Sequence, residues 1–325
     1  MPKPAFESES ASMPSSVIAC ECCGSRRHRL VTRKRGWSIR RCEDCGLFFV
    51  APQPSDAELG RIYSTSDGYF ARAVPDLRQV SPARAQFLDG SYRQLGCPRG
   101  RFLDVGCAHG VLLYPMRALG WTVVGNDLNA DALEIARNHG LEVAHGPLEA
   151  CDFEPESFDA IHLGDLIEHV RSPRRLMATV VGLLRPGGVV SVVTPNARSG
   201  FATGTLLLSR LGGISWAHAQ APYHLYEFTP DNLRRLLHDQ GLRIERERTE
   251  GAGSFPFLVG ATGYFDALKT RLKRSGRYRL DRRVVTDLPK LALVTAGLLP
   301  PFVYGRAIAG RAGRGRIITV FARRA

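Results

Sequence analysis

The fold is decided between residues 102 and 110, where the sequence reads Phe102-Leu103-Asp104-Val105-Gly106-Cys107-Ala108-His109-Gly110. An apolar run that ends in a glycine-rich turn, followed by a helical pattern, predicts a strand, a tight turn and a helix N-terminus. Glycines let the backbone approach a ligand closely, and the first helical turn offers N–H groups without partners in the helix. The stretch therefore predicts a ligand-binding turn, of a kind that many α/β folds share.

Strand and helix patterns continue to alternate beyond this turn. We expect strands at 121–127, 141–145, 158–163, 189–194, 242–248 and 316–322, and helices at 111–119, 130–139, 173–184 and 231–240. Such alternation is typical of an α/β protein with a doubly wound, mostly parallel sheet. The strand after the glycine turn ends at Asp127, whose carboxylate can accept hydrogen bonds from both hydroxyls of a ribose. The alternative interpretation is a solvated carboxylate after an ordinary strand–helix turn.

Three further motifs make the pattern specific. They are Phe158-Asp159-Ala160-Ile161 with Glu168-His169-Val170 beyond it, the turn Leu183-Leu184-Arg185-Pro186-Gly187-Gly188, and Thr194-Pro195-Asn196. Together with the glycine turn and Asp127 they resemble class I S-adenosylmethionine-dependent methyltransferases of the methyltransferase-23 and ubiquinone O-methyltransferase type. The resemblance covers residues 100–248. It implies a Rossmann-like sheet with an antiparallel last strand, and S-adenosyl-L-methionine as the cofactor.

The resemblance also implies positions for the cofactor. Its methionine part is expected at Asp104, Gly106, Cys107 and Gly110, and its ribose at Asp127. Leu128 is expected to pack on the adenine, and Leu148 and Glu149 belong to the loop that closes over that base. Ala108 stands where the family more often has a second glycine, which is tolerated if Ala108 takes a negative φ.

A second group of polar residues follows the expected strand at 158–163. Asp165, Glu168 and His169 are three and four residues apart, so on a helix they would share one face, and His224 comes much later. The pattern resembles that of small-RNA 2′-O-methyltransferases and ubiquinone-pathway O-methyltransferases, in which four such groups hold a divalent ion that polarises the acceptor hydroxyl. Asp165 replaces the commoner Glu and has a shorter reach. Two alternatives stay open: His169 acts as a general base without a metal, or Glu168 and His169 only line the pocket.

Two cysteine pairs precede these motifs. Cys20 and Cys23 are separated by eighteen residues from Cys42 and Cys45, a spacing that predicts a four-cysteine zinc ribbon with a structural Zn²⁺. Cys22 is an extra thiol that could replace a neighbour. The alternative is a set of buried, reduced cysteines without metal. The block resembles the zinc ribbon that precedes methyltransferase domains of cell-surface-sugar and secondary-metabolite pathways.

These patterns divide the chain into six parts. We expect a disordered leader at 1–16, the zinc ribbon at 17–54, a helical connector at 55–98, the cofactor-binding core at 99–250, a helical basic and apolar insertion at 251–314, and the last strand of the core at 315–325. The leader lacks the apolar run of a secretion signal, so a cytoplasmic location is expected. The apolar stretch 288–303 is either part of a cap over the pocket or a peripheral contact with the inner face of the membrane.

The reaction expected from these residues is O-methylation of a small-molecule, sugar or lipid-linked intermediate. The net charge of +13 favours anionic partners, and basic residues surround Trp37 between the cysteine pairs. An RNA methyltransferase that binds its substrate through the ribbon is therefore the first alternative. A non-catalytic scaffold that keeps the fold is the second, and the intact Asp104, Gly106, Gly110 and Asp127 argue against it.

Overall fold

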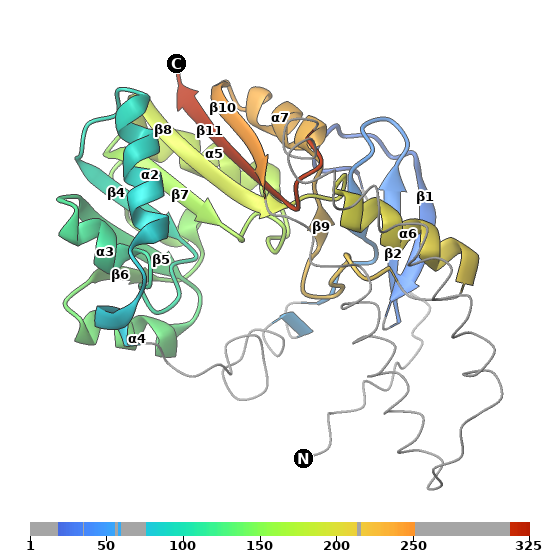
Figure 1. Ribbon diagram of the computed structural model, residues 1–325, viewed down its shortest axis with the longest axis horizontal. Coiled ribbons are helices and arrows are strands. Elements are labelled where there is room, and N and C mark those ends of the chain that lie inside the picture. The colour runs from blue at the N-terminus through green and yellow to red at the C-terminus, as the bar shows by residue number, and fades with distance from the viewer. Residues whose placement is uncertain (1–18, 35, 56–57, 60–75, 213–215, 251–312) are drawn as a thin grey trace, which may run out of the picture.

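The computed structural model describes residues 19–34, 36–55, 58–59, 76–212, 216–250 and 313–325 (Figure 1). The leader expected at 1–16 lies outside the described residues, as do nearly all of the insertion expected at 251–314 and its apolar stretch 288–303. No helix within the described ranges combines the length and the apolar character needed to cross a membrane.

A seven-stranded sheet organises the larger part of the molecule. Five parallel strands run in the order β8-β7-β4-β5-β6, and they are β4 (Arg101–Val105), β5 (Thr122–Asp127), β6 (Glu142–His145), β7 (Phe158–Gly164) and β8 (Leu184–Pro195). β11 (Ile317–Arg324) is antiparallel to both of its neighbours, β8 and β10 (Leu242–Glu250), and Figure 1 shows it in red between them. The predicted doubly wound sheet with an antiparallel last strand is therefore confirmed.

Helices cover both faces of this sheet because its strands are apolar on both sides. One hydrophobic cluster joins Phe102 and Ala160 to α2 (Ala83–Gln94), α3 (Leu113–Ala118) and α4 (Ala130–Asn138). Their strand neighbours Leu103 and Ile161 face the other way, toward α5 (Pro173–Leu183) and α7 (Pro230–His238). Two short 3₁₀ helices, η1 (Leu77–Gln79) and η2 (Leu148–Ala150), lie in connections.

The fifth parallel strand differs from its sequence prediction. Residues 183–188 were expected as the turn before a strand at 189–194, but β8 begins at Leu184 and continues to Pro195. Leu184 pairs with Phe158 at the start of β7, and the register shifts between Phe158 and Ala160. This irregularity takes Pro186 and the two glycines into the strand.

The N-terminal cysteine block forms a second sheet that includes part of the core. β1 (His28–Lys34), β2 (Trp37–Cys42) and β3 (Phe48–Val50) are antiparallel, and the fourth strand is β9 (Tyr226–Glu227), which precedes α7. Cys20, Cys22, Leu47 and Phe49 share a hydrophobic cluster with α5 and α7. Figure 1 shows these strands beside β9 and α6 (Gly200–Gly212), far from the β6 edge. This cysteine-bearing block, residues 19–50, is called the ribbon below. It is docked on the core and shares a sheet with it.

Candidate functional site

The glycine turn lies where the direction of chain winding reverses. The chain goes from β4 to β5 and β6 on one side, and then crosses to β7 on the other side of β4. Ligands of open α/β sheets bind at such a point, at the carboxyl ends of the strands. Gly106 has φ +75°, and a Cβ there would lie 3.0 Å from Leu166 Cδ1, just beyond β7. Glycine therefore lets the turn and the end of β7 come close together at this edge.

Ala108 does not meet the condition under which the sequence made alanine acceptable here. Its φ is +47°, in the left-handed region, and not negative. The physical reason lies in its amide, which donates a hydrogen bond to Asp127 Oδ2 at 2.8 Å. The turn therefore keeps the backbone conformation of a glycine with an alanine in place.

Asp127 ends β5 beside this turn. Its second oxygen, Oδ1, accepts a hydrogen bond from Asn129 N at 2.9 Å, so backbone amides orient both oxygens of the carboxylate. The next residue, Leu128, is 63% exposed, so its apolar side chain is accessible beside the carboxylate. An oriented carboxylate next to an uncovered apolar side chain fits the ribose and the base of a nucleoside.

Of the other side chains expected at the cofactor, three are buried and one lies near an arginine. Asp104 is buried at the end of β4, and burial raises its pKa to about 7 against the opposing charge of Arg84. Cys107 is buried too, and a Cβ on Gly125 would come within 2.6 Å of its sulfur, so its side chain points into the sheet. Leu148 is buried in η2, and the carboxylate of Glu149 lies 4.0 Å from Arg175. Cys107 therefore offers a ligand only its backbone.

Gly110 also serves packing. Its φ is +80°, and a Cβ there would lie 2.4 Å from Leu141 Cδ1. A side chain at this position would push the start of the helical segment away from the residue before β6. Gly110 therefore shapes the cofactor turn through helix–strand packing.

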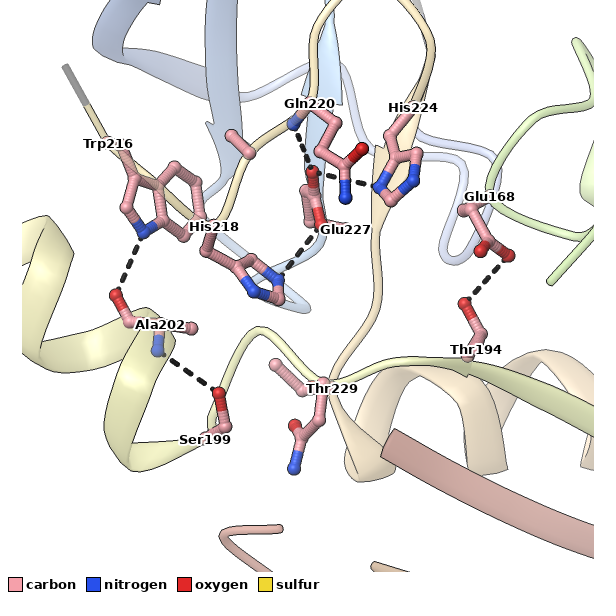
Figure 2. A network of polar contacts seen from close by, with 12 residues as sticks. Glu168, Thr194, Ser199, Ala202, Trp216, His218, Gln220, His224, Glu227 and Thr229 are labelled. Atoms are coloured by element: carbon pink, nitrogen blue, oxygen red, sulfur yellow. Dashed lines mark hydrogen bonds and ion pairs between the residues drawn. The ribbon is translucent and has the colours of Figure 1, made fainter. Parts of the chain in front are cut away.

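Three of the four residues expected at the metal come together. Glu168, His169 and His224 each offer one ligand atom, and these atoms lie within 4.8 Å of one another. His169 Nε2 lies 3.8 Å from Glu168 Oε1, and the two imidazole rings meet edge to face, with centroids 4.8 Å apart. Glu168 and His169 follow β7 and His224 precedes β9, and Figure 2 shows Glu168 and His224 side by side. Residues far apart in the sequence thus form one cluster.

Asp165 lies outside this cluster, and the helix expected from its spacing is absent. Residues 167–169 form a turn, residues 166 and 170 are not helical either, and Asp165 itself has φ +52°. This left-handed residue redirects the chain directly after β7, so spacings of three and four do not select one face here. The Asp165 side chain is 46% exposed and lies 3.9 Å from Arg84 Nη2.

Glu168 carries the feature that fits a cation. The side chain is 1% exposed, and Thr194 Oγ1 donates a hydrogen bond to its Oε2 at 2.9 Å. Its other oxygen, Oε1, is buried without a hydrogen-bond partner among the described residues. Burial raises the pKa of Glu168 to about 7, despite the attraction of His224. A buried carboxylate oxygen that accepts no hydrogen bond costs free energy unless a positively charged group lies next to it.

One ring nitrogen of each histidine contacts a neighbouring oxygen, of Tyr223 or of Glu227, which leaves the other nitrogen for a ligand. His169 Nδ1 lies 2.8 Å from the Tyr223 carbonyl, which can only accept, so Nδ1 donates and Nε2 faces Glu168. Burial, together with the charge of His224, lowers the pKa of His169 to about 4, which keeps its ring neutral. Burial alone would lower the pKa of His224, but Glu227, Glu168 and Asp165 outweigh it and raise that pKa. Carboxylate and neutral imidazole are ligands for Mn²⁺, Fe²⁺ or Zn²⁺.

Sequence reasoning missed two buried residues next to this cluster. Glu227 Oε1 lies 3.4 Å from His224 Nδ1, and Glu227 Oε2 lies 3.0 Å from His218 Nε2 (Figure 2). Burial would raise the pKa of Glu227, but the two histidines outweigh it and hold that pKa at about 2. The available signal was the Glu three residues after His224, in a segment that is extended rather than helical.

The four predicted cysteines of the ribbon form the second candidate metal centre. The Sγ atoms of Cys20, Cys23, Cys42 and Cys45 lie within 4.8 Å of one another, and two of the pairs are 3.5 Å apart. Tetrahedral Zn²⁺ with Zn–S bonds of about 2.3 Å places sulfurs about 3.8 Å apart, so the cluster fits this ion. Cys22 turns away, with its Sγ 3.3 Å from the Asn232 carbonyl.

Comparison with known proteins gives a family match. Residues 70–247, more than half of the chain, match a family model described as a methyltransferase domain. A ubiquinone biosynthesis O-methyltransferase from Chelativorans sp. is 34% identical over 155 residues, which cover 46% of this chain and 60% of that protein. A protein of the same name from Dinoroseobacter shibae is 34% identical over 148 residues, covering 44% of this chain and 59% of that protein.

The chain thus spans less than two thirds of the length of these two relatives. Among solved structures, a SAM-dependent methyltransferase from Archaeoglobus fulgidus is similar with 15% sequence identity and a TM-score of 0.46. That match covers 75% of this chain and 95% of the other.

Proposed function

Because this chain belongs to the methyltransferase domain family, we propose that it transfers the methyl group of S-adenosyl-L-methionine to a hydroxyl oxygen of a small molecule. The observation that carries the proposal is the buried Oε1 of Glu168, which has no hydrogen-bond partner among the described residues and lies beside two histidines. Glu168 and His169 follow β7 at the sheet edge that also carries the glycine turn and Asp127, and His224 joins them from the segment before β9. Polar groups for an acceptor hydroxyl therefore lie close to a nucleoside site. The names of the two relatives support oxygen as the acceptor atom.

The chain's own residues would hold the cofactor as follows. Asp127 accepts hydrogen bonds from the ribose, and the exposed Leu128 packs against the base. The turn from Gly106 to Gly110 approaches the methionine part through its backbone, and Asp104 lies buried beneath it. When bound, the cofactor supplies an electrophilic methyl group on a sulfonium. The role of the protein is then to align the acceptor oxygen with that methyl group and to exclude water.

For the acceptor side, we propose a divalent ion held by Glu168, His169 and His224. Thr194 orients Glu168, and the Tyr223 carbonyl orients His169, so both ligands are held before an ion binds. An ion in this site supplies a Lewis acid that lowers the pKa of a bound hydroxyl. Three protein ligands leave coordination positions for the acceptor. Asp165 is outside this ligand set, and its side chain is 46% exposed beside Arg84.

We also propose a structural Zn²⁺ on Cys20, Cys23, Cys42 and Cys45. Four thiolates complete a tetrahedral coordination sphere, so this ion has no open position for a substrate. Its role is to stabilise the ribbon that docks on α5 and α7.

Two measurements test the proposed function. Calorimetry with S-adenosyl-L-methionine should show saturable binding that Asp127→Ala abolishes, and absence of binding would favour the scaffold alternative. Mass spectrometry of metabolites and of RNA, incubated with and without the enzyme, should show a methyl-mass increase on a small molecule, sugar or lipid-linked compound. An increase on RNA, with affinity that falls steeply with salt, would replace this proposal with the RNA alternative.

A further inference from the structure

Glu227 is a buried carboxylate that the proposed reaction leaves without a role. It is 4% exposed, and three groups surround it: His224 Nδ1 at 3.4 Å, His218 Nε2 at 3.0 Å and the amide of Gln220, which donates at 3.2 Å. Figure 2 shows Glu227 between the two histidines, on the side of His224 that faces away from Glu168. Its carboxylate therefore contacts one nitrogen of a candidate metal ligand from behind.

The two nitrogens of an imidazole lie on different edges of the ring. When one nitrogen contacts a carboxylate, it keeps its proton there, and the lone pair of the other nitrogen is available to a metal. In His224 the nitrogen away from Glu227 is turned toward Glu168 (Figure 2). The arrangement selects Nε2 of His224 as its ligand atom.

Glu227 is itself held by the ribbon. It pairs with Phe48 in the β3–β9 ladder, Tyr226 pairs with Phe49, and Val50 N donates to the Leu225 carbonyl at 2.9 Å. Ile39 and Phe49 of the ribbon line the same gap as His224 and Glu227, and that gap has no room for a water molecule. Because both side chains are also buried, at 5% and 4% exposed, the His224–Glu227 contact is shielded from solvent, which strengthens its electrostatic component.

The same short segment is also bonded to the site. The amides of Leu225 and Tyr226 both donate to the Glu168 carbonyl, at 2.8 and 3.1 Å. Residues 225–227 thus lie between strand β3 of the ribbon and the backbone of Glu168. Backbone hydrogen bonds on both sides fix where Glu227 and His224 stand relative to Glu168.

We propose that Glu227 is a positioning residue that fixes the tautomer and orientation of His224 for metal binding, and that the ribbon strand β3 holds Glu227 in place. The proposal rests on the metal centre proposed above. Carboxylates behind metal-binding histidines typically change metal affinity by about 10- to 100-fold when they are removed.

The test is a Co²⁺ titration of the full chain with its ribbon loaded with Zn²⁺, followed by calorimetry and by d–d absorption. We expect Glu227→Gln to weaken Co²⁺ binding by about 10- to 100-fold and to leave affinity for S-adenosyl-L-methionine unchanged. Asp89→Asn is the matched control, because Asp89 is also a buried, ion-paired carboxylate but lies on α2 beside Arg99 and Trp121. It should bind Co²⁺ as the wild type does.

Each outcome separates this inference from the proposed function. If the wild type and Glu168→Ala bind the same amount of Co²⁺, the proposed metal centre is overturned, and the positioning role of Glu227 is overturned with it. If the wild type binds and Glu227→Gln binds equally well, only the positioning role is overturned. If Glu227→Gln does not fold, ¹H–¹⁵N spectra of the Zn²⁺-saturated wild type decide. They should show the proton of His224 on Nδ1, and a proton on Nε2 would overturn the proposal.

Discussion

Ala108 holds a backbone conformation that costs free energy. A left-handed φ of +47° costs an L-residue about 1–2 kcal/mol, because its Cβ crowds the backbone. Glycine escapes this cost but adds about 0.4–1 kcal/mol of chain entropy to the unfolded state. We therefore expect Ala108→Gly to raise the free energy of unfolding by up to about 1 kcal/mol, measured by urea denaturation.

The control for this change lies on α5. Ala178 is exposed within that helix, and Ala178→Gly should lower the free energy of unfolding by about 1 kcal/mol. If both substitutions destabilise the protein equally, the left-handed conformation of Ala108 carries no strain.

The proposed ligands of the second metal centre make a sharper prediction. We expect Glu168→Ala and His224→Ala each to lower kcat/KM by at least about 100-fold, because each removes a group that holds the ion at the acceptor oxygen. Affinity for S-adenosyl-L-methionine, measured by calorimetry, should not change. Asp165→Ala should have a much smaller effect, because Asp165 lies outside the cluster. Activity that survives both substitutions and EDTA would remove metal catalysis from the proposal.

Sequence motifs predicted most of this site but not its supporting residues. Glu168, His169 and His224 were named from their pattern, and they do come together. Asp165 was included from the motif resemblance and from helical spacing, and its own left-handed backbone prevents the helix. Glu227 and His218 were missed. The spacing of Glu227 after His224 was a weak signal, but the contact between Glu227 and His218 depends on their burial against each other, which no local periodicity encodes.

At the level of elements, the parallel strands were predictable and the link between the two sheets was not. Runs of mostly apolar residues predicted β5 and β7 to within a residue, because strands covered on both faces are largely apolar. β9 is only two residues long and has no pattern to detect. Its partner strand lies more than 170 residues earlier in the chain, so only the folded structure reveals the pairing.

The zinc content of the ribbon can be predicted for single cysteine substitutions. Cys42→Ser should release the Zn²⁺ and destabilise the ribbon, because three thiolates hold zinc far less well than four. Elemental analysis of the purified chain measures the zinc. Cys22→Ser is the control that the structure offers, since Cys22 sits between the knuckle cysteines yet points at Asn232. It should retain a full equivalent of zinc. Unchanged zinc in Cys42→Ser would contradict the four-thiolate site.

Across the whole molecule, the ribbon and the core share a single hydrophobic interior on one face of the main sheet. Cys20, Leu47 and Phe49 belong to the same buried cluster as α5 and α7. Polar contacts add to this docking, since Arg174 donates to the Cys22 carbonyl at 2.7 Å and Ser172 donates to Glu21 at 2.7 Å. Elements that share a core and a sheet are expected to unfold together.

This shared interior predicts how the chain responds to zinc removal. Differential scanning calorimetry of the zinc-loaded chain should show one transition that includes both the ribbon and the core. Zinc bound only by the folded state adds to its stability, so chelation should lower the temperature of that one transition, by about 2–4 °C for each kcal/mol lost. Cys22→Ser should respond to the chelator as the wild type does, because its zinc site is intact. Two separate transitions, of which chelation moved only the lower, would mean that the ribbon folds on its own and that β9 does not couple it to the cluster at Glu168, His169 and His224.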